Sequence, residues 1–301
     1  MTKRSRTVIA SDGLRARNNG SYAKAKLDWL QRYLIEGLKV AKQKQDRVYV
    51  DLFAGPGVSV DKHTGEEFES GALRAITLQS RAATGEPMTE AFLVNLDEND
   101  HRALTQRVER LNEEMRLRIP RSRIHLIHGD ANVAVHQIMA LIHPRAWVFV
   151  FADPEEAGQF PFSTVQALKS RGHSSVDLYT LFPLQLDIQR NLSYRPRRQI
   201  AFAAKLDAYF GTDLWRPVYE ARQTSAQGRE FRDQMEALYC RQLEVLWTKA
   251  SCVARIKMGG ERVLYHMIFA GTNEAALRLA GGVAQAEQRA ANPDQGTLFG
   301  F

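Results

Sequence analysis

The sequence predicts an α/β fold built on a doubly wound, mostly parallel sheet with helices on both faces. Two observations predict it. Short apolar segments alternate with amphipathic helical segments between residues 21 and 181, and the last two apolar segments flank the pair Gly259-Gly260. Alternation of this kind is typical of βαβ units. The glycine pair tolerates the positive φ of a tight turn, so the last two strands should form an antiparallel hairpin.

Each element follows from its own periodicity. Leucines at 27, 30, 34 and 38 recur at helical spacing after Ser21, which can cap that helix. The expected strands are residues 48–50, 91–96, 124–127, 147–151, 176–181, 251–258 and 261–270, and the further helices are 71–81, 99–115, 134–142 and 273–289. The segment 147–151 is apolar throughout, which indicates a central strand buried on both faces. A parallel sheet that ends in an antiparallel hairpin is typical of the class I methyltransferase type, not of the dehydrogenase type.

The domain organisation follows from where this alternation stops. Residues 184–250 are rich in Arg, Gln, Leu and Tyr and interrupt the pattern, so we expect a helical insertion or cap there. The Rossmann-like domain would comprise residues 21–183 and 251–289. Residues 1–20 lack apolar periodicity and are expected to form an irregular basic arm. Residues 56–69 are expected to be a loop, and residues 290–301 a loose tail.

The composition is that of an ordinary globular protein. The chain has 301 residues, of which 44% are apolar, and it has no window of about 18 apolar residues that would predict a membrane span. The basic first ten residues are not followed by a signal-peptide core, so we expect a soluble protein. Two cysteines cannot form a disulfide framework, so we expect a reducing, cytoplasmic location. The two cysteines, Cys240 and Cys252, have no clustered histidines in the sequence, and we predict no metal site.

The positive charge is concentrated near the beginning of the chain. Residues 1–47 contain twelve Lys or Arg and four Asp or Glu, and the rest of the chain is close to neutral. Clustered cations favour binding to a polyphosphate, although a solvated basic surface would give the same pattern. The candidate nucleic-acid ligands are Lys24, Lys26, Arg190, Arg195, Arg197 and Arg198.

A glycine-containing loop directly follows the first strand of the predicted parallel sheet. Its sequence is Asp51-Leu52-Phe53-Ala54-Gly55-Pro56-Gly57. Small residues let the backbone turn sharply and approach a ligand closely, and a carboxylate here suits the amino group of a methionine-type moiety. The chain lacks GxGxxG at this point and has no GKS or GKT, which disfavours nicotinamide and P-loop nucleotides. We therefore predict a cofactor loop, with Asp51, Phe53, Ala54, Gly55 and Gly57 as its binding residues.

The next two strands also end in polar residues. The second strand runs into Asn95-Leu96-Asp97, and either Asn95 or Asp97 could bind ribose hydroxyls. The third runs into His128-Gly129-Asp130-Ala131, where Asp130 and Ala131 are candidates to bind an adenine. A surface loop carboxylate is the alternative for the second strand end, and the Gly129-Asp130-Ala131 triplet is a weak signal by itself.

The fourth strand ends in an acidic loop, Asp153-Pro154-Glu155-Glu156. Carboxylates at the end of an apolar strand are costly unless they are solvated or used. Asp153, Pro154 and Glu155 are the candidate catalytic residues, which could position or deprotonate an acceptor. A loop that faces water, or a magnesium-dependent nuclease or hydrolase, remains an alternative.

At these strand ends the sequence resembles the three-Cys-motif partner family, bacterial proteins with a methyltransferase-like fold. The resemblance rests on Lys26, Leu30, Tyr33 and Leu34, on VDLFAGPG, on Ser70-Gly71-Ala72-Leu73, on Asp153-Pro154 and on Leu181-Phe182-Pro183. Ala72 stands where proline is usual, and Glu155-Glu156-Ala157 replaces the usual aromatic residue and glycine. The resemblance implies binding of S-adenosylmethionine, a cytoplasmic location and a partner protein bearing the three-cysteine motif.

Three functions are consistent with these features. The first is an S-adenosylmethionine-dependent methyltransferase that acts on a nucleic acid or nucleotide-like acceptor. The second is a catalytically silent module that binds a cofactor or nucleic acid together with a partner protein. The third is the metal-dependent nuclease or hydrolase.

Overall fold

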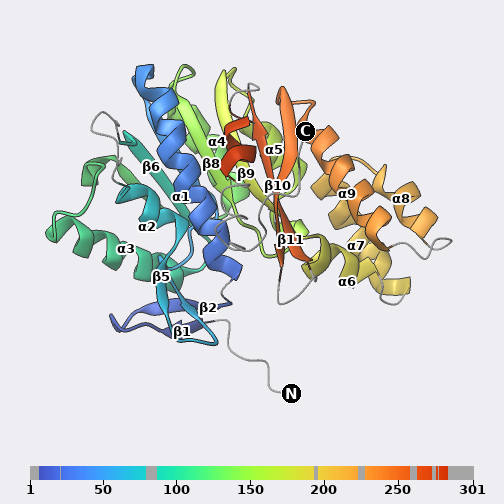
Figure 1. Cartoon of the computed structure of the whole chain (residues 1–301), viewed down its shortest axis with the longest axis horizontal. Coiled ribbons are helices and arrows are strands. Elements are labelled where there is room, and N and C mark those ends of the chain that lie inside the picture. The colour runs from blue at the N-terminus through green and yellow to red at the C-terminus, as the bar shows by residue number, and fades with distance from the viewer. Residues whose placement is uncertain are drawn as a thin grey trace, which may run out of the picture.

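The computed structural model describes residues 7–20, 22–78, 87–192, 196–222, 228–257, 263–272, 276 and 278–283. Its central feature is a seven-stranded sheet in the order β10-β11-β9-β8-β3-β6-β7 (Figure 1). These strands are β3 (Arg47–Asp51), β6 (Glu90–Asn95), β7 (Ile124–His128), β8 (Trp147–Ala152), β9 (Ser175–Phe182), β10 (Lys249–Lys257) and β11 (Val263–Gly271).

One strand of the large sheet is reversed. β11 lies between β9 and β10 and is antiparallel to both, whereas the pairings among β9, β8, β3, β6 and β7 are parallel. A mostly parallel sheet with one reversed strand near its edge is the class I methyltransferase type of the doubly wound fold. The predicted fold class and the antiparallel relation of the last two strands are confirmed, and the turn at Gly259-Gly260 lies outside the described residues.

Helices cover both faces of this sheet. On β3, Tyr49 joins the apolar core beneath α1 (Tyr22–Val40), α2 (Gly71–Ile76) and α3 (Glu98–Glu113). Its neighbours Val48 and Val50 join the opposite core, beneath α4 (Ala131–Leu141), α5 (Phe162–Ala167), α7 (Pro196–Phe210) and α9 (Gly228–Leu243). Successive side chains of a strand point to opposite faces, so a wholly apolar strand serves both cores. The full burial of β8 confirms its predicted central position.

The segment that follows β9 is helical. It contains a π-helical turn, η4 (Leu184–Ile188), then α6 (Gln189–Leu192), α7, α8 (Trp215–Arg222) and α9. Figure 1 shows these helices gathered beside β10 and β11. The ring of Tyr239 on α9 stacks on the rings of Tyr209 and of Phe182 on β9, with centroid distances of 4.8 and 5.2 Å. These contacts pack the helices against the end of the sheet.

Residues 7–19 are more regular than the sequence predicts. Four strands, β1 (Thr7–Ile9), β2 (Arg15–Asn19), β4 (Val58–Asp61) and β5 (Glu67–Glu69), form a small sheet in the order β1-β2-β4-β5. The prediction of an irregular arm is therefore wrong for residues 7–19, and that of an unstructured loop is wrong for much of residues 56–69. The parallel pairing of β2 with β4 joins segments about forty residues apart, which local apolar periodicity cannot report.

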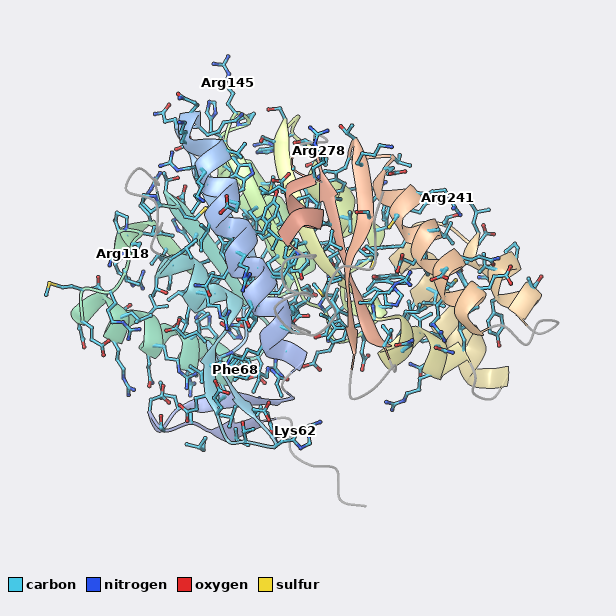
Figure 2. All side chains as sticks on the ribbon, in the orientation of Figure 1. Lys62, Phe68, Arg118, Arg145, Arg241 and Arg278 are labelled. Atoms are coloured by element: carbon cyan, nitrogen blue, oxygen red, sulfur yellow. The ribbon has the colours of Figure 1, made fainter. Side chains whose placement is uncertain are left out.

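The small sheet lies beyond the carboxyl ends of the parallel strands. Figure 2 shows Phe68 of β5 and Lys62, which directly follows β4, at the opposite end of the molecule from Arg145, which precedes β8 at its amino end. Arg107 of α3, with 4% of its side chain exposed, ties the small sheet down. Its guanidinium pairs with Asp12 at 2.8 Å and donates to the carbonyl of Pro56 at 2.5 Å.

Smaller differences between the predicted and the observed elements concern the ends of helices. α3 and α4 begin earlier than predicted because Asp97 and Asp130 cap them through backbone N–H groups. α2 ends at Ile76, earlier than predicted. Of the expected closing helix 273–289, residues 278–283 are helical, and the tail 290–301 is outside the described residues.

No helix of the described chain is both long and apolar enough to cross a membrane. The short 3₁₀ turns are η1 (Ala41–Gln43), η2 (Arg121–Arg123) and η3 (Ala157–Gln159).

Candidate cofactor and acceptor site

The sheet topology brings four of the predicted loops together. β3 pairs in parallel with both β6 and β8, so that Asp51 lies opposite Leu93 and Phe151, and β6 pairs with β7, so that Asn95 lies opposite His128. The loops that follow these strands therefore emerge at one edge of the sheet. In open α/β sheets, ligands bind in the crevice beyond this carboxyl edge.

The cofactor loop is held from two sides. Asp51 has 1% exposure; its Oδ1 accepts from the backbone N–H of Phe53 at 3.1 Å and its Oδ2 from the hydroxyl of Tyr49 at 3.1 Å. Asn95 is also buried, and its side-chain amide donates to the carbonyl of Gly55 at 2.9 Å. Both residues thus shape the loop from behind, and a direct contact of either with a cofactor stays a prediction.

The two glycines adopt conformations that favour glycine. Gly55 has φ of 63° and Gly57 has φ of 95°, both in the left-handed region. A Cβ on Gly57 would lie 3.1 to 3.3 Å from side-chain carbons of Leu104, Leu73 and Arg107. Side chains larger than hydrogen would therefore distort the loop.

Burial raises the pKa of Asp51 to about 7. The N–H of Phe53, the hydroxyl of Tyr49 and the ammonium of Lys26 oppose this effect, and the nearby charge of Asp153 adds to it. A carboxyl with this pKa changes charge near neutral pH, directly beneath the loop.

Asp97 and Asp130 lie at the amino ends of two helices. Oδ1 of Asp97 accepts from the N–H groups of Asn99 at 2.9 Å and Asp100 at 3.0 Å, and Oδ1 of Asp130 accepts from Asn132 at 2.8 Å. The N–H of Asp100 lowers the pKa of Asp97. Both carboxylates are exposed beyond the ends of β6 and β7, whereas Asn95 and Ala131 are buried. Asp97 is therefore better placed than Asn95 to meet a ligand.

The acidic loop after β8 is engaged by cations. The ammonium of Lys26 contacts Oδ2 of Asp153, and Arg17 pairs with Glu155 at 3.2 Å. Glu156 caps the turn η3 together with Gln159, and Pro154 is buried. The ion pairs of Asp153 and Glu155 offer no open carboxylate set for magnesium, so this geometry does not favour the nuclease alternative.

Lys26 is placed differently from its sequence interpretation. It is 7% exposed, and its ammonium lies 5.6 Å from the ring centre of Tyr265 in addition to its contact with Asp153. This burial contradicts its assignment to a phosphate-binding surface. Lys24 pairs with Glu66 at 2.5 Å, and Arg190 is exposed. Arg195 lies outside the described residues, as do the side chains of Arg197 and Arg198.

Two arginines of β2, Arg15 and Arg17, also belong to this edge and were not among the residues predicted from the sequence. Arg15 and Arg17 pair with the two oxygens of Asp100, at 2.8 and 2.9 Å, and the carboxyl of Asp100 has 1% exposure. Burial raises the pKa of Asp100, and both guanidiniums oppose that shift. Arginines two residues apart lie on one face of a strand, so the spacing would have identified them once residues 15–19 were recognised as a strand.

The backbone of this edge leaves room for a ligand. Among the described residues, a Cβ on Gly129 would meet no heavy atom within 4 Å, and one on Gly55 would meet only Nε of Arg17, at 3.9 Å. Open backbone at the ends of β3 and β7, beside exposed carboxylates that can accept from hydroxyl and amino groups, fits an adenosyl cofactor.

Comparison with solved structures agrees with the fold. A protein of family DUF519 from Legionella pneumophila superposes with a TM-score of 0.50 at 12% identity, covering 91% of this chain and 94% of that one. Spermidine synthase from Thermotoga maritima gives a TM-score of 0.39 at 9% identity, with 96% of this chain and 71% of that chain covered. The plantazolicin methyltransferase in complex with S-adenosylhomocysteine gives a TM-score of 0.35 at 12% identity, with 84% of this chain and 86% of that chain covered. Only the first score supports a common fold, and none of the identities carries a substrate across.

No family model matches the sequence, and no curated protein matches it. The chemistry of the site must therefore be argued from its own residues.

Proposed function

We propose that the protein is an S-adenosylmethionine-dependent methyltransferase that acts on a nucleic acid or nucleotide-like acceptor. The observation that carries the proposal is the open backbone at Gly55 and Gly129, flanked by exposed Asp97 and Asp130, at the carboxyl edge of a class I methyltransferase-type sheet. When bound, S-adenosylmethionine supplies an activated methyl group with a neutral thioether as leaving group.

The cofactor residues have distinct roles in this proposal. Asp97 accepts from the ribose hydroxyls through Oδ2, the carboxylate oxygen that does not cap α3 and that forms an exposed pair with Arg15 at 3.5 Å. Asp130 accepts from the adenine amino group beside Ala131. The backbone of residues 53–57 holds the methionine part, while Asp51 and Asn95 fix the conformation of that loop through their bonds to Phe53 and Gly55.

The acceptor would lie against the loop after β8. Pro154 holds this loop rigid, and the Lys26 ammonium fixes the orientation of Asp153. Asp153 then positions the acceptor or takes its proton as the methyl group is transferred. Glu155 becomes available to an acceptor once its exposed pair with Arg17 opens, and such exposed pairs are weak, at about 0–1 kcal/mol.

The cofactor assignment is tested by calorimetric titration of S-adenosylmethionine into wild type, Asp97→Ser and Asp130→Ser. Serine retains the helix cap but cannot reach the ligand, so the fold is preserved while a contact is removed. Each variant should bind about 10-fold more weakly, corresponding to a lost charge-assisted hydrogen bond of roughly 1.5–3 kcal/mol. Glu98→Gln, which changes an exposed carboxylate one residue from Asp97, is the control and should bind like wild type. Equal affinity in all four proteins would contradict the assignment.

The second candidate is a catalytically silent binding module, which is favoured by the internal pairing of Asp153 with Lys26 and of Glu155 with Arg17. The resemblance to the three-Cys-motif partner family supplies its proposed companion, a protein with that motif. Transfer of labelled methyl from S-adenosylmethionine to DNA, RNA or nucleotides, abolished in Asp153→Asn, would decide for the enzyme. Tight cofactor binding without transfer, with or without such a companion, would decide for the module.

A further inference from the structure

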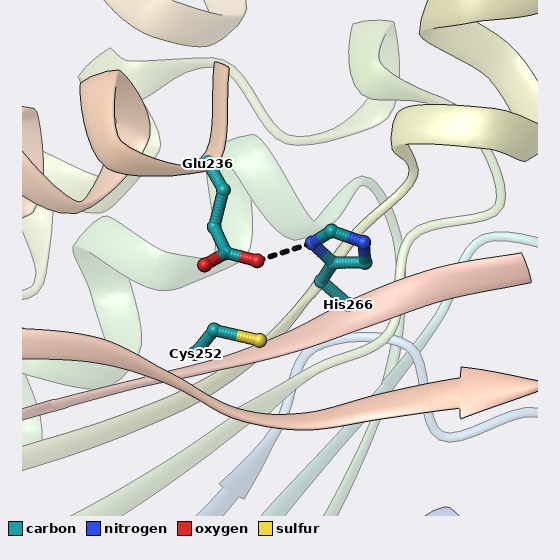
Figure 3. A group of neighbouring side chains, drawn as sticks. All are labelled: Glu236, Cys252 and His266. Atoms are coloured by element: carbon teal, nitrogen blue, oxygen red, sulfur yellow. Dashed lines mark ion pairs between the residues drawn. The ribbon is translucent and has the colours of Figure 1, made fainter. Parts of the chain in front are cut away.

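We propose that Glu236, Cys252 and His266 form a zinc-binding site that fastens α9 to the β10–β11 pair. Figure 3 shows the three side chains converging, Glu236 from the helix and the other two from the adjacent strands. The site is separate from the proposed methyltransferase chemistry and does not depend on it.

The geometry suits a small metal ion. One ligand atom from each residue lies within 4.8 Å of the others, and Nδ1 of His266 directly contacts Oε2 of Glu236. Tetrahedral zinc has bonds of about 2.0–2.3 Å, which places its ligand atoms roughly 3.3–3.8 Å apart. Small side-chain rotations that move the ligand atoms by up to about 1 Å therefore bring all three into bonding range.

The strand register creates this cluster. Cys252 lies opposite Ile268 and Arg255 opposite His266, so Cys252 and His266 are diagonal neighbours on antiparallel strands. The neighbouring residue Tyr265 belongs to the core on the opposite face, beneath α1, while α9 covers the face on which His266 contacts Glu236. The sequence shows no histidine clustered with the cysteines, because His266 is brought beside Cys252 by strand pairing and not by sequence spacing.

The donor set selects the metal. Sulfur, imidazole nitrogen and one carboxylate oxygen are ligands of zinc and similar borderline divalent ions, whereas calcium and magnesium prefer oxygen ligands alone. Three protein ligands leave a fourth position for water. His266 is 1% exposed, and zinc bound there would be largely screened from solvent.

The surrounding charges also fit a divalent cation. Arg255 pairs with Asp233 at 2.9 Å and with Glu236 at 3.3 Å, so two carboxylates face a single guanidinium. Binding of a divalent ion with loss of the thiol proton makes the group neutral. Arg255 then orients Glu236 from behind, in the way that hydrogen-bonded neighbours generally hold metal-ligating carboxylates.

A metal-free ion pair between Glu236 and His266 is the alternative structure. In that case Cys252 contributes only a thiol hydrogen bond to Glu236, and its replacement should leave the metal content unchanged. The thiol therefore separates the two accounts, and Cys240 on the same helix as Glu236 provides a matched control.

The experiment uses the full chain, stripped with a chelator and then dialysed against Zn²⁺ or Co²⁺. Wild type and Cys240→Ser should retain one zinc per chain by elemental analysis, and their cobalt forms should show thiolate-to-cobalt charge-transfer absorption. Cys252→Ser should lose the charge-transfer band and bind zinc at least 10-fold more weakly. No stoichiometric zinc in wild type, or a charge-transfer band that survives in Cys252→Ser and disappears in Cys240→Ser, would overturn the proposal.

Thermal unfolding provides a second readout that does not require the variants to reach full yield. Zinc in excess of its dissociation constant should raise Tm of wild type and Cys240→Ser by several degrees, because the ion binds only the folded chain. The shift should be absent in Cys252→Ser and in His266→Gln. An equal zinc-dependent shift in all four proteins would place the metal elsewhere and contradict the site.

Discussion

Asp51 has the most unusual protonation chemistry among the residues of the cofactor loop. Its carboxyl is buried and accepts from the N–H of Phe53 and the hydroxyl of Tyr49, and burial raises its pKa from 3.8 to about 7. Between pH 3.8 and about pH 7, the folded chain therefore keeps the Asp51 carboxyl protonated to a greater extent than the unfolded chain does. The stability that Asp51 contributes is present below pH 4 and is lost as the pH rises to 7.

Asp51→Asn should remove this pH dependence, because asparagine stays neutral and can still accept from the N–H of Phe53. Relative to the variant, wild type should lose on the order of 3 kcal/mol of unfolding free energy between pH 4 and pH 7. Urea unfolding at a series of pH values measures the difference, with Glu98→Gln as an exposed-carboxylate control. Parallel curves for wild type and Asp51→Asn would show that Asp51 has the same pKa in both states.

At the scale of elements, β2 joins the small sheet to the site. Arg17 bridges Asp100 at the beginning of α3 and Glu155 after β8, next to Gly55 of the cofactor loop. Removing one of the two cations that neutralise a buried carboxylate is costly, whereas an exposed helical ion pair contributes little.

Arg17→Ala should therefore destabilise the fold by about 1–3 kcal/mol, and Arg102→Ala on α3 by less than about 0.5 kcal/mol. Arg102 pairs with Glu98 on the helix surface, which makes it the matched control. Denaturant midpoints give the comparison, and hydrogen exchange of residues 15–19 should accelerate only in Arg17→Ala. Similar midpoints for the two variants would mean that the β2 contacts are as weak as surface pairs.

The same elements show what the sequence could and could not predict. The strands of the large sheet were predictable because each is an apolar run of its own, such as Val48-Tyr49-Val50. β2 was missed because its sequence, Arg15-Ala16-Arg17-Asn18-Asn19, has no apolar alternation and is held by pairing with β4. The cluster at Cys252 and His266 needed the strand register, which spacing alone does not supply.

For the whole molecule, the order β9-β8-β3-β6-β7 explains why loops far apart in the chain share one edge. The order of these strand ends was implicit in the fold class, so residues 51–57, 97, 130 and 153 could be predicted as neighbours. Which of these residues faces a ligand could not be predicted, because it depends on burial and on ion pairing. Asp97 is exposed whereas Asn95 is buried, and Lys26 pairs with Asp153.

Hydrogen exchange with and without S-adenosylmethionine measures whether an adenosyl cofactor binds at this edge of the sheet. With the cofactor bound, we expect slower exchange in peptides covering residues 51–57, 95–100 and 128–132, with little change at residues 228–243 of α9. No protection at saturating cofactor, or protection confined to α9, would rule out a cofactor at this edge.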